Sequence, residues 1–246
     1  MSTTLPPPYT PPAALLSQLR GHGFAVLAPQ AVAALCGVEP GALAALAPSW
    51  DTLPPDEYLR DGGRYRHRRH ACFVVDDGEP ALAPHRAHWQ SLEYNALHGG
   101  MHRWFEPVEP ALLARPAWPR LLGALSRLFS QLREESRWFV EAHQFRIDTA
   151  DGIGRPTPEG AHRDGVDFVA VLLVARANIK GGETRVFAAD GPQGQRFTLA
   201  QPWSLLLLDD ARMIHESTPI QPADAALPGH RDTLVLTYRA GAFQGE

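Results

Sequence analysis

The 246-residue sequence predicts a mainly β protein with flanking helices, folded as a double-stranded β-helix of the cupin jelly-roll type. Three observations lead to this prediction. After Arg137 the chain divides into short β-prone runs separated by turn residues. Two of these runs, Phe168–Val174 and Leu205–Leu208, are continuously apolar, which is typical of strands buried on both faces. The first third is rich in alanine and leucine, which favours a helical layer beside the strands.

The elements expected before residue 137 form a flank to the β region. We expect a helix at Ala13–Arg20, a strand at Phe24–Leu27 and two short helical segments before residue 50. Arg64–Val75 is a candidate strand. Apolar side chains recur at helical spacing in Pro119–Arg133, which predicts an amphipathic helix that packs on the core.

The β-rich part runs from about residue 137 to 240. Its candidate strands are Trp138–Asp148, Phe168–Ala177, Glu183–Ala188, Arg196–Leu199, Ser204–Leu208 and Thr233–Arg239. A chain of this length fits one domain over residues 1–246. Within it we expect a helical N-terminal flank (1–60) and a β core (about 137–240) that carries the chemistry.

Composition narrows the class of partner. The formal charge of −4 provides no basic surface for nucleic acid, although Arg64–His70 is a local cationic run that suits a solvated strand or the lining of an anionic site. Two cysteines argue against a disulfide scaffold, and no secretory signal or membrane span is visible. We therefore expect a cytoplasmic protein that does not bind a membrane. A homo-oligomer is left open.

The most informative motif is His162-Arg163-Asp164. On a β-strand, side chains two residues apart point to the same side, so His162 and Asp164 can bind one metal ion. His215, 51 residues after Asp164, would complete a set of two histidines and one carboxylate, which suits octahedral iron(II) with open positions. A second triplet, His230-Arg231-Asp232, has no histidine after it. The first triplet is therefore the predicted metal site.

Several stretches together resemble a known family. They are Pro158–Phe168, Gly181-Gly182-Glu183, Leu208-Asp209-Asp210 with His215, Thr218-Pro219-Ile220 and Arg231-Asp232-Thr233. They look like the bacterial 2OG-Fe dioxygenases, and more narrowly the branch that includes L-isoleucine and related free amino acid hydroxylases. The resemblance is dense over Trp138–Tyr238 and thinner at Arg64–Arg69 and Gln90–Arg103.

The resemblance implies iron(II), 2-oxoglutarate as cosubstrate and O2. It implies oxidative decarboxylation of 2-oxoglutarate to succinate, coupled to hydroxylation of a C–H bond. Arg231 is the candidate anchor for the distal carboxylate of 2-oxoglutarate, with Thr233 on the same strand face as a second donor. The alternative makes Arg231 a surface cation paired with Asp232. Related halogenases lack the carboxylate ligand, so the presence of Asp164 favours hydroxylation.

The resemblance also suggests a free small L-amino acid as the substrate, hydroxylated on its side chain. Such a substrate needs a cation for its carboxylate and an anion for its ammonium group. The candidates are Arg146 or Arg66 for the carboxylate, Glu159 or Asp167 for the ammonium, and Tyr94 and Asn95 as polar contacts. We expect no catalytic residue beyond the metal ligands. A second metal site is not expected, because no HExxH or CxxC spacing occurs.

Two other functions remain open at this stage. The same chemistry could act on a peptide or a carrier-tethered aminoacyl group, which would need an open groove instead of a closed pocket. A non-catalytic cupin-like binding module would need a defective metal triad, and the three ligand positions are intact. Asp210, after the run Leu205–Leu208, either ends a strand or hydrogen-bonds to a ligating histidine. Gly165 serves either a close approach or a plain turn.

Overall fold

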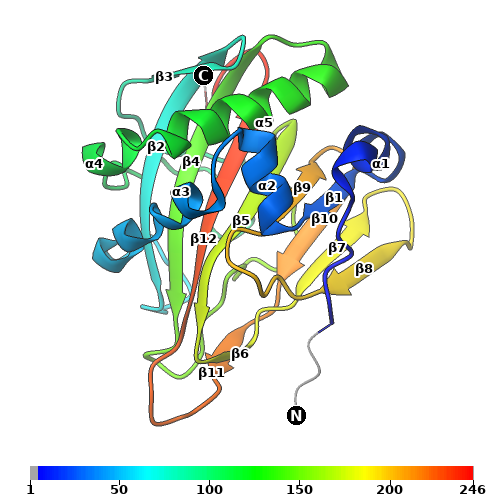
Figure 1. Cartoon of the computed structure of the whole chain (residues 1–246). Helices are drawn as coiled ribbons and strands as arrows, with labels where there is room; N and C mark the ends of the chain where they lie inside the picture. The colour runs from blue at the N-terminus through cyan, green and yellow to red at the C-terminus, as the bar shows by residue number, and fades with distance from the viewer. Residues whose placement is uncertain (1–4, 246) are drawn as a thin grey trace.

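The structure, a computed structural model, describes residues 5–245 and is built around one antiparallel sheet of seven strands (Figure 1). From edge to edge its strands are β1 (Phe24–Leu27), β9 (Leu205–Asp209), β5 (Phe168–Ala177), β12 (His230–Arg239), β4 (Arg137–Asp148), β2 (Arg66–Asp76) and β3 (Glu79–Leu82). β12 lies near the centre and pairs over its whole length with β4. Strands that are distant in sequence are therefore neighbours in space.

Two smaller sheets complete the β structure. Their strands are β10 (Met213–Ser217), β7 (Thr184–Ala188) and β8 (Gly194–Phe197) in one, and β11 (Ile220–Pro222) and β6 (Ile179–Gly181) in the other. Val186 of β7 and Phe197 of β8 share one buried apolar cluster with Val169 and Leu173 of the large sheet. Two antiparallel layers thus enclose one interior, which confirms the predicted jelly roll with flanking helices.

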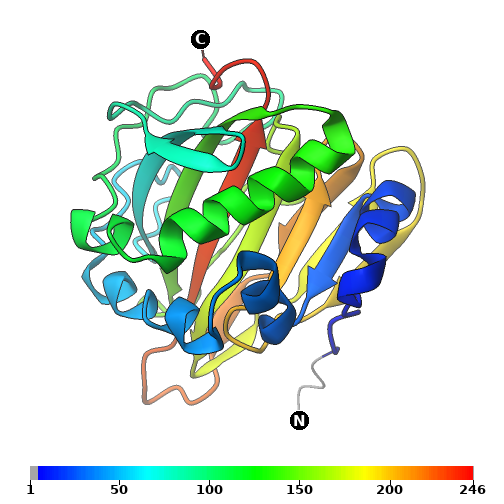
Figure 2. The same ribbon diagram turned by 45° about the horizontal axis from the view of Figure 1, so that its top comes forward.

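Helices cover the outer face of the large sheet. They are α1 (Leu15–His22), α2 (Pro29–Cys36), α3 (Pro40–Ala44), α4 (Pro110–Leu113) and α5 (Ala117–Arg133), with 3-10 turns at Pro12–Ala14 and Ala47–Thr52. Figure 2 shows α5 lying across this face. The ring of Phe129 in α5 stacks on Phe168 of β5 at a centroid distance of 4.3 Å, and both are buried. The apolar stripe predicted for this helix is therefore core.

The two faces of β12 have opposite character. Leu234, Leu236 and Tyr238 point toward the helical layer and belong to the main apolar core. Arg231 and Thr233 point to the other side and line a cavity between the sheets. Because strand side chains alternate, β2, β4, β5 and β12 can each present one set of side chains to the helical layer and another to the cavity.

The structure departs from the sequence predictions at several boundaries. β12 begins at His230 instead of Thr233, because His230 already pairs with Asp148 of β4. β2 begins at Arg66. Residues 83–109, for which no element was predicted, run as a loop that forms an isolated bridge between His88 and Arg103 and contributes to the cavity. β2 and this loop extend the functional part of the fold beyond the expected 137–240 core.

Among residues 5–245, no single helix is both long and apolar enough to span a membrane. Pro29–Cys36 and Pro40–Thr52 meet those criteria only as a pair, and the pair is bent by 96°.

A substitution at Gly123 of α5 tests the contact between this helix and the turn that joins β2 to β3. A Cβ at Gly123 would overlap the carbonyl oxygen of Gly78, so Gly123→Ala should destabilise the protein, although alanine normally favours a helix. Gly21 of α1 has nothing within 4 Å of such a Cβ, so Gly21→Ala should stabilise by up to about 1 kcal/mol. Urea unfolding of both variants measures the difference. Equal effects would contradict the described packing of α5.

Candidate metal centre and adjoining cavity

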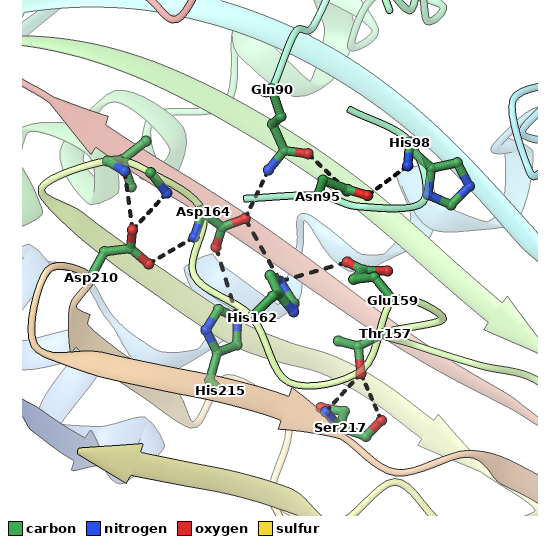
Figure 3. A network of polar contacts seen from close by, with 12 residues as sticks. Gln90, Asn95, His98, Thr157, Glu159, His162, Asp164, Asp210, His215 and Ser217 are labelled. Atoms are coloured by element: carbon green, nitrogen blue, oxygen red, sulfur yellow. Dashed lines mark hydrogen bonds and ion pairs between the residues drawn. The ribbon is translucent and has the colours of Figure 1, made fainter. Parts of the chain in front are cut away.

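His162, Asp164 and His215 converge between the two sheets. One ligand atom from each lies within 4.8 Å of the others. His162 Nε2 is 3.9 Å from Asp164 Oδ1, and His215 Nε2 is 3.8 Å from Asp164 Oδ2 (Figure 3). His230 is not part of this group. The donor set of two imidazole nitrogens and a carboxylate suits iron(II).

The backbone around the motif differs from the expectation. The pair His162 and Asp164 was expected on a strand, but both residues lie in the loop between β4 and β5. A two-way bridge fixes His162 beside β10: its N–H donates to the carbonyl of His215 at 3.0 Å and its carbonyl accepts from His215 N–H at 2.9 Å. Thr157 Oγ1 adds a bond to the carbonyl of Ser217 at 3.1 Å. The loop is thereby held along β10.

Asp210, directly after β9, holds the other half of the loop. Its carboxylate accepts the backbone N–H groups of Asp164 at 2.9 Å, Gly165 at 2.7 Å and Val166 at 3.1 Å. Asp210 therefore does more than end a strand. Its carboxylate holds the backbone of the metal loop and, in the described residues, does not bind a ligating histidine. Gly165 adopts φ +77°, and a Cβ there would meet the ring of Tyr94 at 2.4 Å, so the glycine serves both a turn and a close approach.

Gln90 orients the carboxylate of Asp164. Its Nε2 donates to Asp164 Oδ1 at 3.2 Å. Its Oε1 accepts from Asn95 Nδ2 at 3.1 Å and from Arg103 Nη2 at 2.9 Å, so the amide can face only one way. The family resemblance included the stretch Gln90–Arg103, but it gave no role to Gln90, because the loop has no periodicity that would show where its side chains point. Its position became visible only in the fold.

The hydrogen bond of His162 and the burial of His215 suit metal binding. His162 Nδ1 donates to the carbonyl of Gly160 at 2.9 Å, which leaves the Nε2 lone pair facing the centre. Burial lowers the pKa of His215 well below its ordinary range and keeps this imidazole neutral. His215 Nδ1 is buried and has no hydrogen-bond partner in residues 5–245. Both imidazoles can therefore turn an Nε2 atom to one ion.

Negative charge is concentrated around the centre. Burial, with the charge of Glu159, raises the pKa of Asp164, while burial and Asp164 raise the pKa of Asp210. Burial alone would lower the pKa of His162, but the charges of Asp164 and Glu159 raise it. A cation at this point would relieve the repulsion among the carboxylates.

Arg231 and Thr233 both reach the cavity from β12. Each is only 3% exposed. Arg231 Nε is buried without a partner in the described residues. Burial, with the charge of Arg176, lowers the pKa of Arg231 to about 10. Asp232 does not pair with it, because it faces the opposite side and binds Arg146 at 2.7 Å. Among residues 5–245, the fold thus leaves a buried guanidinium that lines the cavity without a carboxylate partner.

The expected substrate residues divide into two groups. Arg66, Glu159 and Asn95 line the cavity, and Arg66 Nε also donates to Asp56 at 2.6 Å. Arg146, Asp167 and Tyr94 do not line it.

Three corrections follow. Arg146 fails because cavity-facing positions on β4 have odd numbers, such as Glu141 and His143, and Arg146 points to the helical side. Asp167 instead accepts the N–H of Ala240 at 2.9 Å. The ring of Tyr94 packs on the loop at Gly165.

The structure also gathers a second histidine group that spacing in the sequence did not predict. His70 Nε2 and His88 Nδ1 lie 2.9 Å and 2.6 Å from Glu141 Oε2, and His143 Nε2 lies 3.7 Å from it. All four residues are buried, and their candidate ligand atoms lie within 4.8 Å of one another. They come from β2, the 83–109 loop and β4, so no short motif could have revealed them.

Several solved structures are similar to this chain over most of its length. The crystal structure of a bsmA homolog from Methylobium petroleophilum PM1 is 56% identical, over 96% of this chain and 96% of that one, with a TM-score of 0.91. IDO from Bacillus thuringiensis is 18% identical, over 94% of this chain and 100% of that one, with a TM-score of 0.76. The Fe(II)/(alpha)ketoglutarate-dependent dioxygenase TqaL is 18% identical, over 95% and 88%, with a TM-score of 0.72. At 18% identity the last two show the fold alone.

No curated protein sequence matches this one. The sequence profile of the 2OG-Fe dioxygenases, however, matches residues 47–237, which include the metal triad, Arg231 and the 83–109 loop. The profile match and the site geometry lead to one conclusion: the chain belongs to the 2OG-Fe dioxygenase family.

Proposed function

We propose that this protein is an iron(II)/2-oxoglutarate-dependent dioxygenase that hydroxylates a C–H bond in the side chain of a free small L-amino acid. Membership of the family implies iron(II) as the metal cofactor, with 2-oxoglutarate and O2 as cosubstrates. The observation that carries the substrate proposal is a buried cavity beside the metal triad whose charged walls include both signs.

In this proposal, His162, Asp164 and His215 bind the iron. When bound, the iron and 2-oxoglutarate supply the oxidising chemistry, and the protein positions and shields it. Asp210 and Gln90 keep the carboxylate of Asp164 in place, and His162 is oriented by its bond to Gly160. Because a carboxylate occupies the third ligand position, hydroxylation is favoured over halogenation.

Arg231 and Thr233 are proposed to hold the distal carboxylate of 2-oxoglutarate. A guanidinium can donate two parallel N–H bonds to a carboxylate, and the Thr233 hydroxyl lies on the same strand face. The unpartnered Nε of Arg231 supports this role, since a buried donor without an acceptor is costly.

The remaining charges of the cavity suit a zwitterion. Beyond the iron ligands and Arg231, the charged side chains that line the cavity are Arg66, Arg68, Arg103, Glu141 and Glu159, and Asp56 behind the wall pairs with Arg66 at 2.6 Å. The presence of both signs suits a ligand that carries a carboxylate and an ammonium group, as an amino acid does. Arg68 and Arg103 are only 3% and 2% exposed, which favours a small enclosed ligand over a peptide in an open groove.

Ligand variants test the metal assignment. Asp164→Ala should abolish hydroxylation and weaken iron binding, because the site loses its anionic ligand. His215→Ala should also lose iron, whereas His230→Ala should keep it, since His230 lies outside the group. Iron content after anaerobic reconstitution, together with succinate formation, measures these effects. Iron loss in His230→Ala, or full iron binding in Asp164→Ala, would refute the assignment.

Arg231 variants test the cosubstrate site. Arg231→Ala should raise the KM for 2-oxoglutarate at least about tenfold, because a charged hydrogen bond is stronger than a neutral one. Thr233→Val should raise it less. Substrate-independent turnover of 2-oxoglutarate gives both constants. An unchanged KM in Arg231→Ala would assign the carboxylate to another arginine.

The substrate proposal is tested by incubating the protein with iron(II), 2-oxoglutarate, O2 and a pool of free L-amino acids. We expect one or a few small amino acids to gain one oxygen, with succinate formed in step, as measured by mass spectrometry. If no free amino acid stimulates turnover while a peptide or an aminoacyl thioester does, the free amino acid substrate is wrong and the tethered alternative replaces it.

A further inference from the structure

The second histidine group lies at the cavity wall and surrounds one carboxylate. Glu141 and His143 from β4 and His88 from the 83–109 loop line the cavity, while His70 of β2 lies behind them. Hydrogen bonds from His70 and His88 end on one oxygen of Glu141, Oε2. We infer that Glu141, held by these two histidines, binds the ammonium group of the substrate. This inference rests on the function proposed above.

The tautomers of the three imidazoles follow from their partners. An arginine can only donate, so Arg68 Nη2 at 2.7 Å makes Nδ1 of His143 an acceptor. The single N–H of neutral His143 is therefore on Nε2, the atom 3.7 Å from Glu141 Oε2. A carboxylate can only accept, so His70 donates from Nε2 and His88 from Nδ1. His70 and His88 therefore donate to the same carboxylate oxygen, and the N–H of His143 lies on the nitrogen 3.7 Å from it.

This arrangement fits an anion better than a metal ion. A metal ligand needs a lone pair where each of these rings carries its proton. For His143 to bind a metal through Nε2, its proton would have to move to Nδ1, where it would oppose the N–H of Arg68. Arg68 and Arg103 also place positive charge beside the group, and both interact electrostatically with Glu141. The histidines therefore stabilise an ionised Glu141.

Glu141 has one oxygen left for a ligand. In residues 5–245, no hydrogen bond reaches its Oε1, and that atom is not among the fully buried unpaired ones. Burial would raise the pKa of Glu141, but His88 and His70 offset it and hold the pKa well below its ordinary range. An ionised carboxylate on a residue that is only 6% exposed is costly unless it is paired. A primary ammonium group would satisfy it.

Arg68 and Arg103, next to Glu141, are the proposed partners of the substrate carboxylate. Arg68 is clamped between Phe105 and Phe145, with its guanidinium carbon 3.7 Å and 4.4 Å from the two ring centroids. Arg103 donates to Gln90, and its Nε is buried without a partner in the described residues. Neither forms an ion pair with Glu141 within 4 Å there. A carboxylate facing these arginines would leave the α-amino group to Glu141.

The test compares each amino acid with its 2-hydroxy acid, which keeps the shape and the carboxylate but lacks the positive charge. The probes are L-valine, L-leucine, L-isoleucine, L-methionine and their 2-hydroxy analogues. We expect the wild-type protein to prefer the amino acid in kcat/KM. Glu141→Gln should reduce this preference roughly 10- to 100-fold, since a charged hydrogen bond is lost. Iron and 2-oxoglutarate binding should not change.

The controls separate this inference from a structural role. Glu109→Gln removes a carboxylate that is paired with Arg69 outside the cavity, and it should keep the wild-type preference. An equal loss for amino and hydroxy acids in Glu141→Gln would overturn the inference. If that variant does not fold, the wild-type comparison decides, and equal kcat/KM for both compounds would refute it.

Two further outcomes would overturn the inference in different ways. A second equivalent of bound metal that is lost in His70→Ala would replace the ammonium site with a metal site. If the wild-type protein binds iron and 2-oxoglutarate but no amino acid stimulates turnover, the proposed substrate class fails, not the role of Glu141 alone.

Discussion

The alternation of side chains along the seven-stranded sheet is the constraint on which the site depends. One face of the central strands buries apolar side chains under α5 and its neighbours, so the other face is left to line the interior. On β12 this parity places Arg231 and Thr233 in the cavity and sends Asp232 to the opposite side. A shift of one residue on β12 would exchange the two sets and remove the guanidinium of Arg231 from the cavity, and the same shift on β4 would remove the carboxylate of Glu141.

The metal centre adds loop structure to that sheet. Neither His162 nor Asp164 is on a regular strand, and three interactions replace the rigidity that a strand would give. β10 pairs with the backbone of His162, Asp210 binds the next stretch of backbone, and Gln90 fixes the carboxylate. Such support matters because ligand geometry sets metal affinity and reactivity. The connection through Gln90 to Arg103 also links the metal ligand to the wall of the substrate cavity.

Much of this arrangement was predictable from local patterns. The apolar runs and turns indicated the jelly roll, and the spacing of His162, Asp164 and His215 indicated the group that the fold brings together. Arg146 was misplaced because the parity of β4 cannot be derived from a strand with polar residues on both faces. Glu141, His88 and Gln90 were missed because they meet only through strand pairing and a loop without periodicity. Local sequence does not encode such long-range contacts.

The central claim is that the protein presents a preformed cage to iron and 2-oxoglutarate. A crystal structure with manganese(II) and 2-oxoglutarate, grown without oxygen, tests it most directly. We predict that His162, Asp164 and His215 bind the ion with their side chains oriented as described here and that Arg231 pairs with the distal carboxylate. The account would be contradicted if the ion were held by other residues, such as the group around Glu141, or if the cosubstrate carboxylate paired with a different arginine.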